Sequence, residues 1–283
     1  MHNETQIKDL PLTRGVGVLA SNEDGLVALE KPIGVLAHPN SAKDKERALL
    51  DAAYDYDEEC FSWQNEAGEE QRVWLINRLD SPTSGVILIG LNAEIATTIK
   101  QLFATHKVAK TYYAVVKRAP SLPTGVWNDS LKKDVLRGKR LVRNGQSVPA
   151  KARYQVVKSP VGGFPVSLIK LMPVTGRTHQ LRVQCKKHGH PIVGDRTYGS
   201  FSFNREVSRE TGEKRMMLHS GETSVRYAFN GKMKDFKAVS ELPEAFQSVL
   251  SFRPGLNHGR PQPKSASKKR PVSSSLAARR FRR

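Results

Sequence analysis

The sequence has little cysteine and no long apolar run. Its only two cysteines are Cys60 and Cys185, too few for the disulfide framework of a small secreted domain, and this scarcity is typical of a reducing compartment. No apolar run approaches the roughly 20 residues that a membrane-spanning helix requires. The opening residues, MHNETQIKDLP, lack the basic and then apolar pattern of a secretory signal. We therefore expect a cytoplasmic protein with no membrane partner.

Acidic residues are also scarce, with 27 Asp and Glu against 46 Lys and Arg, which gives a formal net charge of +19. Such an excess is typical of polyanion binders, and nucleic acid is the partner we expect. Ten of the basic residues lie in residues 253–283, which contain no Asp or Glu and few large apolar side chains. That composition predicts a disordered basic tail that binds polyanions, with a solubilising role as the alternative. The rest of the chain still carries +9.

Apolar periodicity predicts more strands than helices. The strands are expected within residues 23–34, 73–80, 85–92, 110–118, 153–159 and 165–174. The helices are expected within residues 43–57, 92–108, 178–189 and 240–252, with Asn92, Thr178 and Ser240 as N-caps of the last three, and residues 58–71 are expected to form a surface loop. Because strands and helices do not alternate one for one, the pattern predicts an α+β fold with a mixed, mostly antiparallel sheet.

One carboxylate, Asp80, lies between two apolar runs in the stretch LINRLDSPTSGVILIGLN, residues 75–92. In an extended segment side chains alternate, so Arg78 and Asp80 would project to one side and Leu79 into the core. The polar residues that follow predict a turn, which leaves the carboxylate at a strand end. Two interpretations remain open from the residues alone: an aspartate that bonds to its own turn, or a catalytic carboxylate in a cleft.

A second feature is the stretch PVTGRTHQLRVQCKKHGHPIVGDRTYG, residues 173–199. A strand, a turn and a helix start together form a site that favours anions, because free N–H groups point outward there. Positive side chains add to this tendency, namely Arg177, Arg182, Lys186 and Lys187. The alternative is an amphipathic helix whose basic face is simply solvated.

The same stretch contains possible zinc ligands, namely His179, Cys185, His188 and His190. Their spacings match none of the usual paired-ligand patterns, and the second cysteine lies far upstream. We therefore expect no metal.

A third feature is the pair Tyr112 and Tyr113 in KTYYAVV, residues 110–116. In a strand the two rings point to opposite faces, so one can be buried while the other is exposed. An exposed tyrosine on a basic protein can stack on a nucleic-acid base, although two aromatic residues in a strand are also ordinary core.

Taken together, the motifs resemble the RluA-type pseudouridine synthases. The resemblance is carried by RLDSPTSG, KTYYA and GRTHQLRV, in this order, and covers about residues 24–220. Supporting matches are EKPIGVLAHP, GHPIVGDRTYG and MLHS. The resemblance implies a pseudouridine synthase fold with a central RNA-binding cleft and helices flanking the sheet, in a monomer. We expect a short extension at residues 1–13, the catalytic domain at residues 14–252 and the tail at residues 253–283.

The resemblance also implies a reaction and roles. The N1–C1′ bond of a uridine in RNA is cleaved, the base rotates, and it rejoins through C5, without cofactor or metal. Asp80 is implied as the catalytic residue, acting as nucleophile or as base, Arg182 as its charge partner and Tyr112 as the ring that stacks on the target. Arg78 is expected to fill the space that the extruded base leaves. Further RNA contacts are expected from Thr83, Ser84, Gly85, Lys110, Arg177, Thr178, His179 and Gln180.

Three departures from the family pattern bear on which RNA is modified. Asn77 and Gln184 stand where histidine is common. Because the first motif begins near residue 24, we also expect no S4-type RNA-binding domain of the kind that precedes many members. Both 23S rRNA and tRNA are open as substrates. The main rival is a non-catalytic RNA-binding or ribosome-assembly protein on the same fold. A metal-dependent nuclease is disfavoured because no carboxylate cluster accompanies the motifs.

Overall fold

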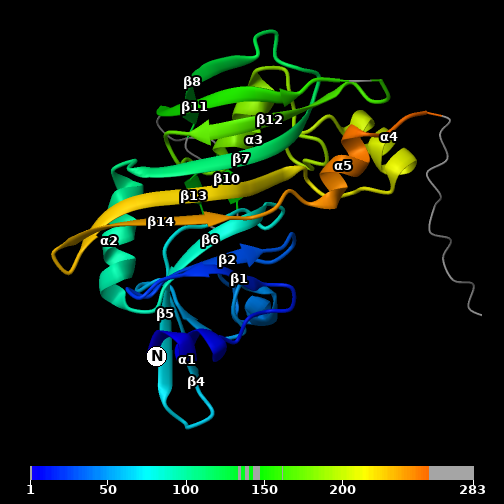
Figure 1. Cartoon of the computed structure of the whole chain (residues 1–283). Helices are drawn as coiled ribbons and strands as arrows, with labels where there is room; N and C mark the ends of the chain where they lie inside the picture. Colours follow the sequence, from blue (N-terminus) through cyan, green and yellow to red (C-terminus); the bar gives the residue numbers. More distant parts are fainter. Residues whose placement is uncertain (1, 133–134, 138–139, 143–146, 161, 255–283) are drawn as a thin grey trace, which may run out of the picture. The chain divides into compact units, whose positions relative to one another are not determined.

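The computed structural model describes residues 2–132, 135–137, 140–142, 147–160 and 162–254 (Figure 1). Its helices are α1 (His2–Lys8), the 3-10 helix η1 (Ala42–Arg47), α2 (Ala93–Ala104), α3 (Gln180–Lys187), α4 (Phe201–Thr211) and α5 (Glu244–Leu250). Its strands are β1 (Gly17–Ser21), β2 (Leu26–Lys31), β3 (Ala53–Asp55), β4 (Cys60–Gln64), β5 (Glu70–Leu75), β6 (Ser84–Gly90), β7 (Val108–Lys117), β8 (Thr124–Lys132), β9 (Val135–Arg137), β10 (Arg140–Val142), β11 (Ser147–Lys158), β12 (Val166–Pro173), β13 (Leu218–Phe229) and β14 (Lys232–Val239).

Residues Met1–Phe252 form one compact unit. Leu10 is buried in its core, so the expected boundary between residues 1–13 and 14–252 does not separate two packed bodies; as a functional division it stays a prediction. Residues 255–283 of the expected tail lie outside the described residues, and the expected disorder also stays a prediction. None of the helices in the described residues is both long and apolar enough to cross a membrane.

Within the described residues the main sheet has 12 strands, in the order β3-β4-β5-β6-β13-β7-β12-β11-β8. Strand β2 adds to β6, β1 adds to β2, and β14 adds to β13. The pairing is antiparallel except between β6 and β13, which run parallel over a short contact. The predicted α+β class with a mostly antiparallel sheet is therefore confirmed. Figure 1 shows β8, β11, β12, β7 and β13 following one another across the sheet.

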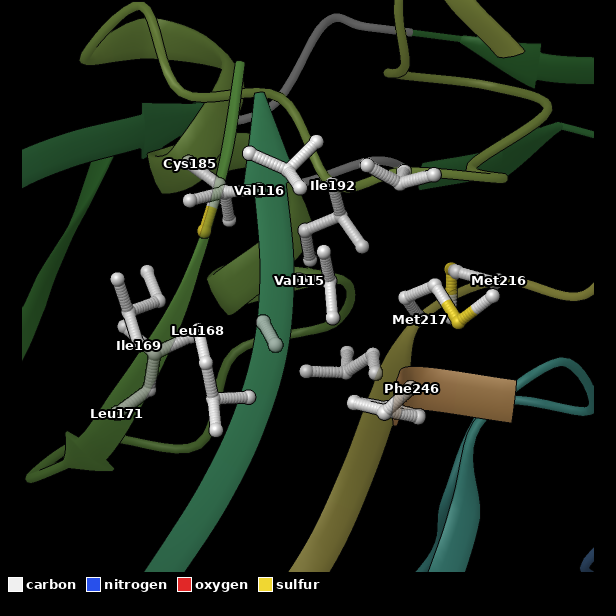
Figure 2. Packing of buried hydrophobic residues seen from close by; sticks show 14 of the residues in the cluster. Val115, Val116, Leu168, Ile169, Leu171, Cys185, Ile192, Met216, Met217 and Phe246 are labelled. Carbon is white, nitrogen blue, oxygen red and sulfur yellow. The ribbon is translucent and has the colours of Figure 1, made fainter. Parts of the chain in front are cut away.

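The core explains why the central strands are so apolar. All seven residues of β6 are buried, as expected of a strand covered on both faces, whereas β11 alternates between buried and exposed positions. The largest cluster of buried side chains lies around β7, where Figure 2 shows Cys185, Val116 and Ile192 gathered at one end and Met217 and Phe246 beside β13. This packing fixes α3, which carries Arg182, against the sheet.

Two local predictions are wrong. Residues 43–57 form only the 3-10 helix η1 and then β3, because Ala48 and Leu50 are buried in bridges to Leu36 and Leu12 instead of continuing a helix. Residues 58–71 are not a loop but most of the β4–β5 hairpin, whose register places Phe61 opposite Val73 in the core. In both cases pairing with distant residues overrides local propensity.

Of the three predicted N-caps, only Asn92 is confirmed: its side chain accepts a hydrogen bond from the Ile95 N–H. Helix α3 begins one residue later than predicted, after His179, because that residue has a left-handed φ of 54° that a helix cannot include. Helix α5 is preceded by Pro243, while the hydroxyl of Ser240 hydrogen-bonds to His219.

Candidate active site

Asp80 lies in the turn that connects β5 to β6, where the Thr83 N–H donates to the Asp80 carbonyl. Residues 76–80 are not part of a strand, yet the predicted alternation is present: Arg78 is exposed, Leu79 is buried and Asp80 lies between these extremes. The Asp80 carboxylate accepts a hydrogen bond from Arg182 Nη1 at 2.9 Å. Among the residues that the structure describes, the carboxylate therefore bonds to Arg182, and no hydrogen bond from its own turn to the carboxylate is found.

Arg182 is itself held by a second carboxylate. Its Nε and Nη2 donate to the two oxygens of Asp195 at 2.8 and 3.0 Å, and Asp195 also accepts from the N–H groups of Thr197 and Tyr198. Burial raises the pKa of Asp195, but these hydrogen bonds outweigh burial and hold that pKa below its ordinary value. The alternative of a solvated basic face is therefore wrong for Arg182, which is only 5% exposed. A fixed guanidinium aims the Asp80 carboxylate.

His179 approaches the same oxygen of Asp80 as Arg182 does. Its Nε2 is 3.7 Å from Asp80 Oδ2, and its Nδ1 is 3.1 Å from the Tyr198 hydroxyl. The Tyr198 ring faces the guanidinium of Arg182 at 5.1 Å. A left-handed backbone at a histidine is a costly conformation, which is characteristic of residues held in place for function.

Tyr112 enters the site from β7, at the position where this strand pairs with Ser220 of β13. Burial raises the pKa of Tyr112 to about 12, and the negative charge of Asp80 acts in the same direction, while a hydrogen bond with Ser220 opposes them. Tyr112 is therefore neutral near pH 7. Tyr113 packs over Gly221. Both rings are half-buried and pack against the same core cluster, so the predicted division into one buried and one exposed tyrosine is wrong.

These residues surround one open pocket with a cavity volume of about 130 Å³. The predicted site residues that line it are Arg78, Asp80, Thr83, Lys110, Tyr112, Arg177, His179, Gln180 and Arg182. Ser84, Gly85 and Thr178 are not among the described residues of the lining. Ser84 and Gly85 lie in the sheet beneath the site, and Thr178 is exposed outside the pocket. An RNA contact by these three residues stays a prediction.

The two departures from the family pattern support the backbone around the site. Asn77 accepts a hydrogen bond from the Leu88 N–H, and Gln184 donates to Asp129 and to the Ala150 carbonyl. Gln180 joins this network, since it donates to Gln184 and accepts from the Arg177 N–H. Asn77 and Gln184 therefore stabilise the strands and the start of α3, and neither is among the described residues that line the pocket.

Sequence reasoning missed two charged residues of the site. Asp195 lies in GHPIVGDRTYG and Lys31 lies in EKPIGVLAHP. Both motifs supported the family resemblance, but nothing in them showed which residues these two side chains contact. Lys31 is fully buried, and its Nζ donates to the carbonyls of Pro32, Val35 and Ser81, which ties it to the turn that carries Asp80. Burial lowers the pKa of Lys31 to about 7, and the charge of Asp80 opposes this shift.

Beneath the site a buried chain of hydrogen bonds joins β6 to β13. Arg215 donates to the Ser84 hydroxyl, whose Oγ lies 2.8 Å from Nδ1 of His219, and Nε2 of His219 lies 2.9 Å from the Ser240 hydroxyl. Burial lowers the pKa of His219 to about 4, and the positive charge of Arg215 adds to this effect, so the ring is neutral. The neighbouring Gly85 has a φ of 109°, and a Cβ there would lie 2.1 Å from the Ser220 carbonyl oxygen. This junction sets the start of β6 and therefore the turn with Asp80.

Within the described residues, no group of three His, Cys, Asp or Glu side chains is arranged to hold a metal ion. Of the candidate zinc ligands, Cys185 is fully buried in the core and His188 hydrogen-bonds to Asp129. What the pocket offers is an aimed carboxylate, a neutral phenol and several cations.

The sequence of residues 25–187 matches the family model described as RNA pseudouridylate synthase. A tRNA pseudouridine synthase C from Haemophilus ducreyi is 36% identical over 210 residues, 70% of this chain and 80% of that protein. The same-named protein of Pectobacterium carotovorum subsp. carotovorum is 32% identical over 81% of this chain, which spans only 60% of that relative's length. A ribosomal large subunit pseudouridine synthase D from Zymomonas mobilis is 29% identical, over 89% of this chain and 75% of that protein.

Among solved structures, human RNA pseudouridylate synthase domain containing 4 is similar with a TM-score of 0.61 and 23% identity. The similarity covers 89% of this chain and 97% of that one. At this identity the likeness concerns the fold.

Proposed function

Since this chain belongs to the RNA pseudouridylate synthase family, we propose that it converts specific uridines of tRNA into pseudouridine. The match confirms the family that the motifs indicated. The preference for tRNA rests on the relatives named tRNA pseudouridine synthase C, which are more similar to this chain than the ribosomal relative. The observation that carries the catalytic proposal is the hydrogen bond between Arg182, fixed by Asp195, and Asp80 at the pocket wall.

In this proposal Asp80 is the catalytic carboxylate and acts on the ribose or the base of the target uridine. Such a group must keep its direction during the reaction. Arg182 holds it in place, because it is positively charged and because its other two donating nitrogens are occupied by Asp195. A preorganised charge of this kind needs no rearrangement when charge develops in the transition state.

Tyr112 is proposed to stack on the target uracil. Its ring lines the pocket, as Asp80 does, and its backbone is held by the pairing of β7 with Ser220 of β13. Because its pKa is raised to about 12, the phenol keeps its proton at neutral pH. It can therefore donate a hydrogen bond to the base.

Arg78 is proposed to take the place of the extruded base. Extrusion costs a few kcal/mol, which a cation inserted into the vacated stack offsets. Arg78 suits this role because it is exposed at the pocket rim, two residues before Asp80. Lys110 and Arg177 line the same pocket and are proposed to contact phosphates next to the target. The enzyme is proposed to act as a monomer, on tRNA in the cytoplasm, with no metal or cofactor.

The test is a site-resolved pseudouridine map of total RNA from cells with and without the gene, paired with the purified protein acting on tRNA and on 23S rRNA fragments. We expect one or a few tRNA uridines to lose the modification in the deletion strain and to regain it in vitro. Loss confined to rRNA would contradict the tRNA assignment. Maps that are identical in both strains, together with an inactive protein, would support the rival, a non-catalytic RNA-binding protein.

A further inference from the structure

A cluster of aromatic side chains extends from the core to the surface beside the pocket. The ring centroids of His38 and Tyr54 are 5.1 Å apart in a stacked arrangement, and Tyr56 meets Tyr54 edge-on at 5.1 Å. Phe61, fully buried, supports Tyr54 from below at 4.7 Å. Tyr56 is 54% exposed, which is high for an aromatic residue in so packed a group. We refer to His38, Tyr54 and Tyr56 as the surface aromatic cluster.

This cluster is joined to the pocket by Arg78. The Nη1 of Arg78 is 3.4 Å from Nε2 of His38. An arginine only donates, so His38 Nε2 accepts and the ring carries its proton on Nδ1, which lies 2.9 Å from the Pro39 carbonyl. The hydroxyl of Tyr56 donates to the same carbonyl at 2.9 Å. His38 and Tyr56 are therefore both held at the Pro39 carbonyl, and Arg78, which lines the pocket, connects them to it.

The charges around the cluster indicate which part of a nucleic acid it can bind. The turn that follows Tyr54 is acidic, with Asp55, Asp57, Glu58 and Glu59 in the space of five residues. Burial raises the pKa of Tyr54, and Glu59 adds to this, whereas Arg78 opposes it, so both signs of charge act on the ring. An acidic turn repels phosphates, but an aromatic face binds any unpaired base.

We propose that the surface aromatic cluster is a second base-binding subsite, which stacks an unpaired RNA base adjacent to the uridine in the pocket. This inference rests on the proposed function, since it takes the pocket as the site of the target base. When one base leaves the stack, its neighbour loses a stacking partner. In the proposed complex Arg78 takes the place of the extruded base. Tyr56, which is linked to Arg78 through His38, offers a stacking surface to the neighbouring base. The subsite binds the unpaired base itself and does not contact its phosphate.

The test compares Tyr56→Ala with Tyr56→Phe, which keeps the ring and loses the hydroxyl. Met233→Ala is the matched control, because Met233 is 59% exposed on β14, outside both the pocket and the cluster. The probe is a fluorescein-labelled single-stranded oligouridine of 12 nucleotides, and a second version carries one 2-aminopurine, whose fluorescence falls on stacking. Affinities are measured over a salt series without any turnover.

Stacking is worth roughly 1–3 kcal/mol per base, so Tyr56→Ala should weaken binding about 5- to 150-fold. Tyr56→Phe should bind within about twofold of wild type on the same reasoning, and Met233→Ala should bind like wild type. The salt dependence should not change, and 2-aminopurine should be quenched by wild type and Tyr56→Phe but not by Tyr56→Ala.

Three results would overturn the subsite. Tyr56→Ala binding like Met233→Ala would mean that no base stacks there. If Tyr56→Phe weakens RNA binding as much as Tyr56→Ala, Tyr56 acts through its hydrogen bond to the Pro39 carbonyl and not by stacking on a base. A salt slope flattened by about 0.7 in Tyr56→Ala would indicate a phosphate contact instead. Because binding is measured without turnover, a protein that binds through Tyr56 but forms no pseudouridine would fail the proposed function and keep the subsite.

Discussion

Arg182 connects two carboxylates that differ in exposure. The Asp195 side chain is fully buried, whereas that of Asp80 is 26% exposed at the pocket. A buried charge without a partner costs several kcal/mol, so Arg182 must neutralise Asp195 whether or not the site is active. Its third donor then reaches Asp80 at no further cost in ordering, because the guanidinium is already fixed.

This double role predicts that Arg182→Met lowers stability as well as activity. The free energy of unfolding should fall by about 3–5 kcal/mol, because Asp195 is left buried and unpaired. Adding Asp195→Asn removes that charge, so the double variant should recover part of the lost stability but none of the pseudouridine formation. Chemical denaturation and single-turnover assays on the three proteins check both effects. Recovery of activity in the double variant would contradict the proposed action of Arg182 on Asp80.

His219 predicts a pH dependence of stability. Its pKa is lowered from 6.5 to about 4 in the folded state, so the unfolded chain binds more protons between these pH values. The contribution of the neutral ring is fully present above pH 6.5 and is lost as the pH falls towards 4, by an amount on the order of 3 kcal/mol.

The measurement is the free energy of unfolding of wild type minus that of His219→Gln, from pH 7.5 to 4. Taking the difference cancels the other titrating groups and leaves the slope caused by His219. We expect this difference in the free energy of unfolding to decrease as the pH falls, because wild type loses stability that His219→Gln does not have. A difference that does not depend on pH would show that the ring is not held neutral.

The sequence was sufficient for part of the site and not for the rest. Asp80, Tyr112 and Arg182 stand in three motifs, and the structure brings them into one pocket. The link from Arg182 to Asp195 could not be predicted, because the two residues lie 13 positions apart across the end of α3 and only the tertiary fold brings them together. The same holds for Lys31, whose contact with the Ser81 carbonyl spans 50 positions.

At the level of elements, the site depends on the point where β6, β13 and β7 meet. Gly85 of β6 is paired with Ser220 of β13, and Ser220 is paired with Tyr112 of β7. The turn with Asp80 leads directly into this junction, so its position is set by the sheet. No side chain fits at Gly85, because a Cβ would collide with backbone and not with a flexible side chain.

Gly85→Ala should therefore separate β6 from β13. We expect a loss of at least about 3 kcal/mol in the free energy of unfolding, since the strained φ and the backbone collision act together. Gly231→Ala is the control: Gly231 also has a positive φ, of 72°, but has open space around it, so only the backbone cost of roughly 1–2 kcal/mol applies. Equal losses in the two variants, measured by denaturation, would contradict the tight junction.

Elements were predictable where local signals agreed with the fold. Helix α2 lies within the predicted range and has the predicted cap at Asn92, and its apolar residues Ile95 and Ile99 are buried. The failure at residues 43–57 has a clear cause: Ala48 and Leu49 suit a helix, but Ala48 and Leu50 form bridges to other segments and all three residues are buried. Helical periodicity in so short a segment does not outweigh such pairings.

At the scale of the whole molecule, positive charge is the dominant property. Residues 1–252 carry +9, and ten more basic residues follow from Arg253 onward. A basic surface and a basic tail both bind phosphates without reading sequence, which adds affinity and salt dependence and leaves specificity to the pocket.

Deleting residues 254–283 should weaken RNA binding and leave the chemical step unchanged. The deleted segment carries nine Lys and Arg, and each phosphate that it neutralises on single-stranded RNA contributes about −0.7 to the slope of log affinity against log salt. If four of the nine engage phosphates, the slope should flatten by about 3. Affinity over a salt series and the rate at saturating RNA are compared with full-length protein. An unchanged slope would assign the tail to solubility, and a collapsed saturated rate would place it at the active site.

The most direct test of the account is the rate of pseudouridine formation by Asp80→Asn under single-turnover conditions with tRNA in excess of its binding constant. Asparagine keeps the size of the side chain and removes the negative charge, and Asp235→Asn, at an exposed aspartate on β14, is the matched control. We predict no pseudouridine above background for Asp80→Asn, RNA affinity within a few-fold of wild type, and full activity for Asp235→Asn. An Asp80→Asn protein that is folded by circular dichroism and isomerises uridine near the wild-type rate would contradict the assignment of Asp80 as the catalytic residue.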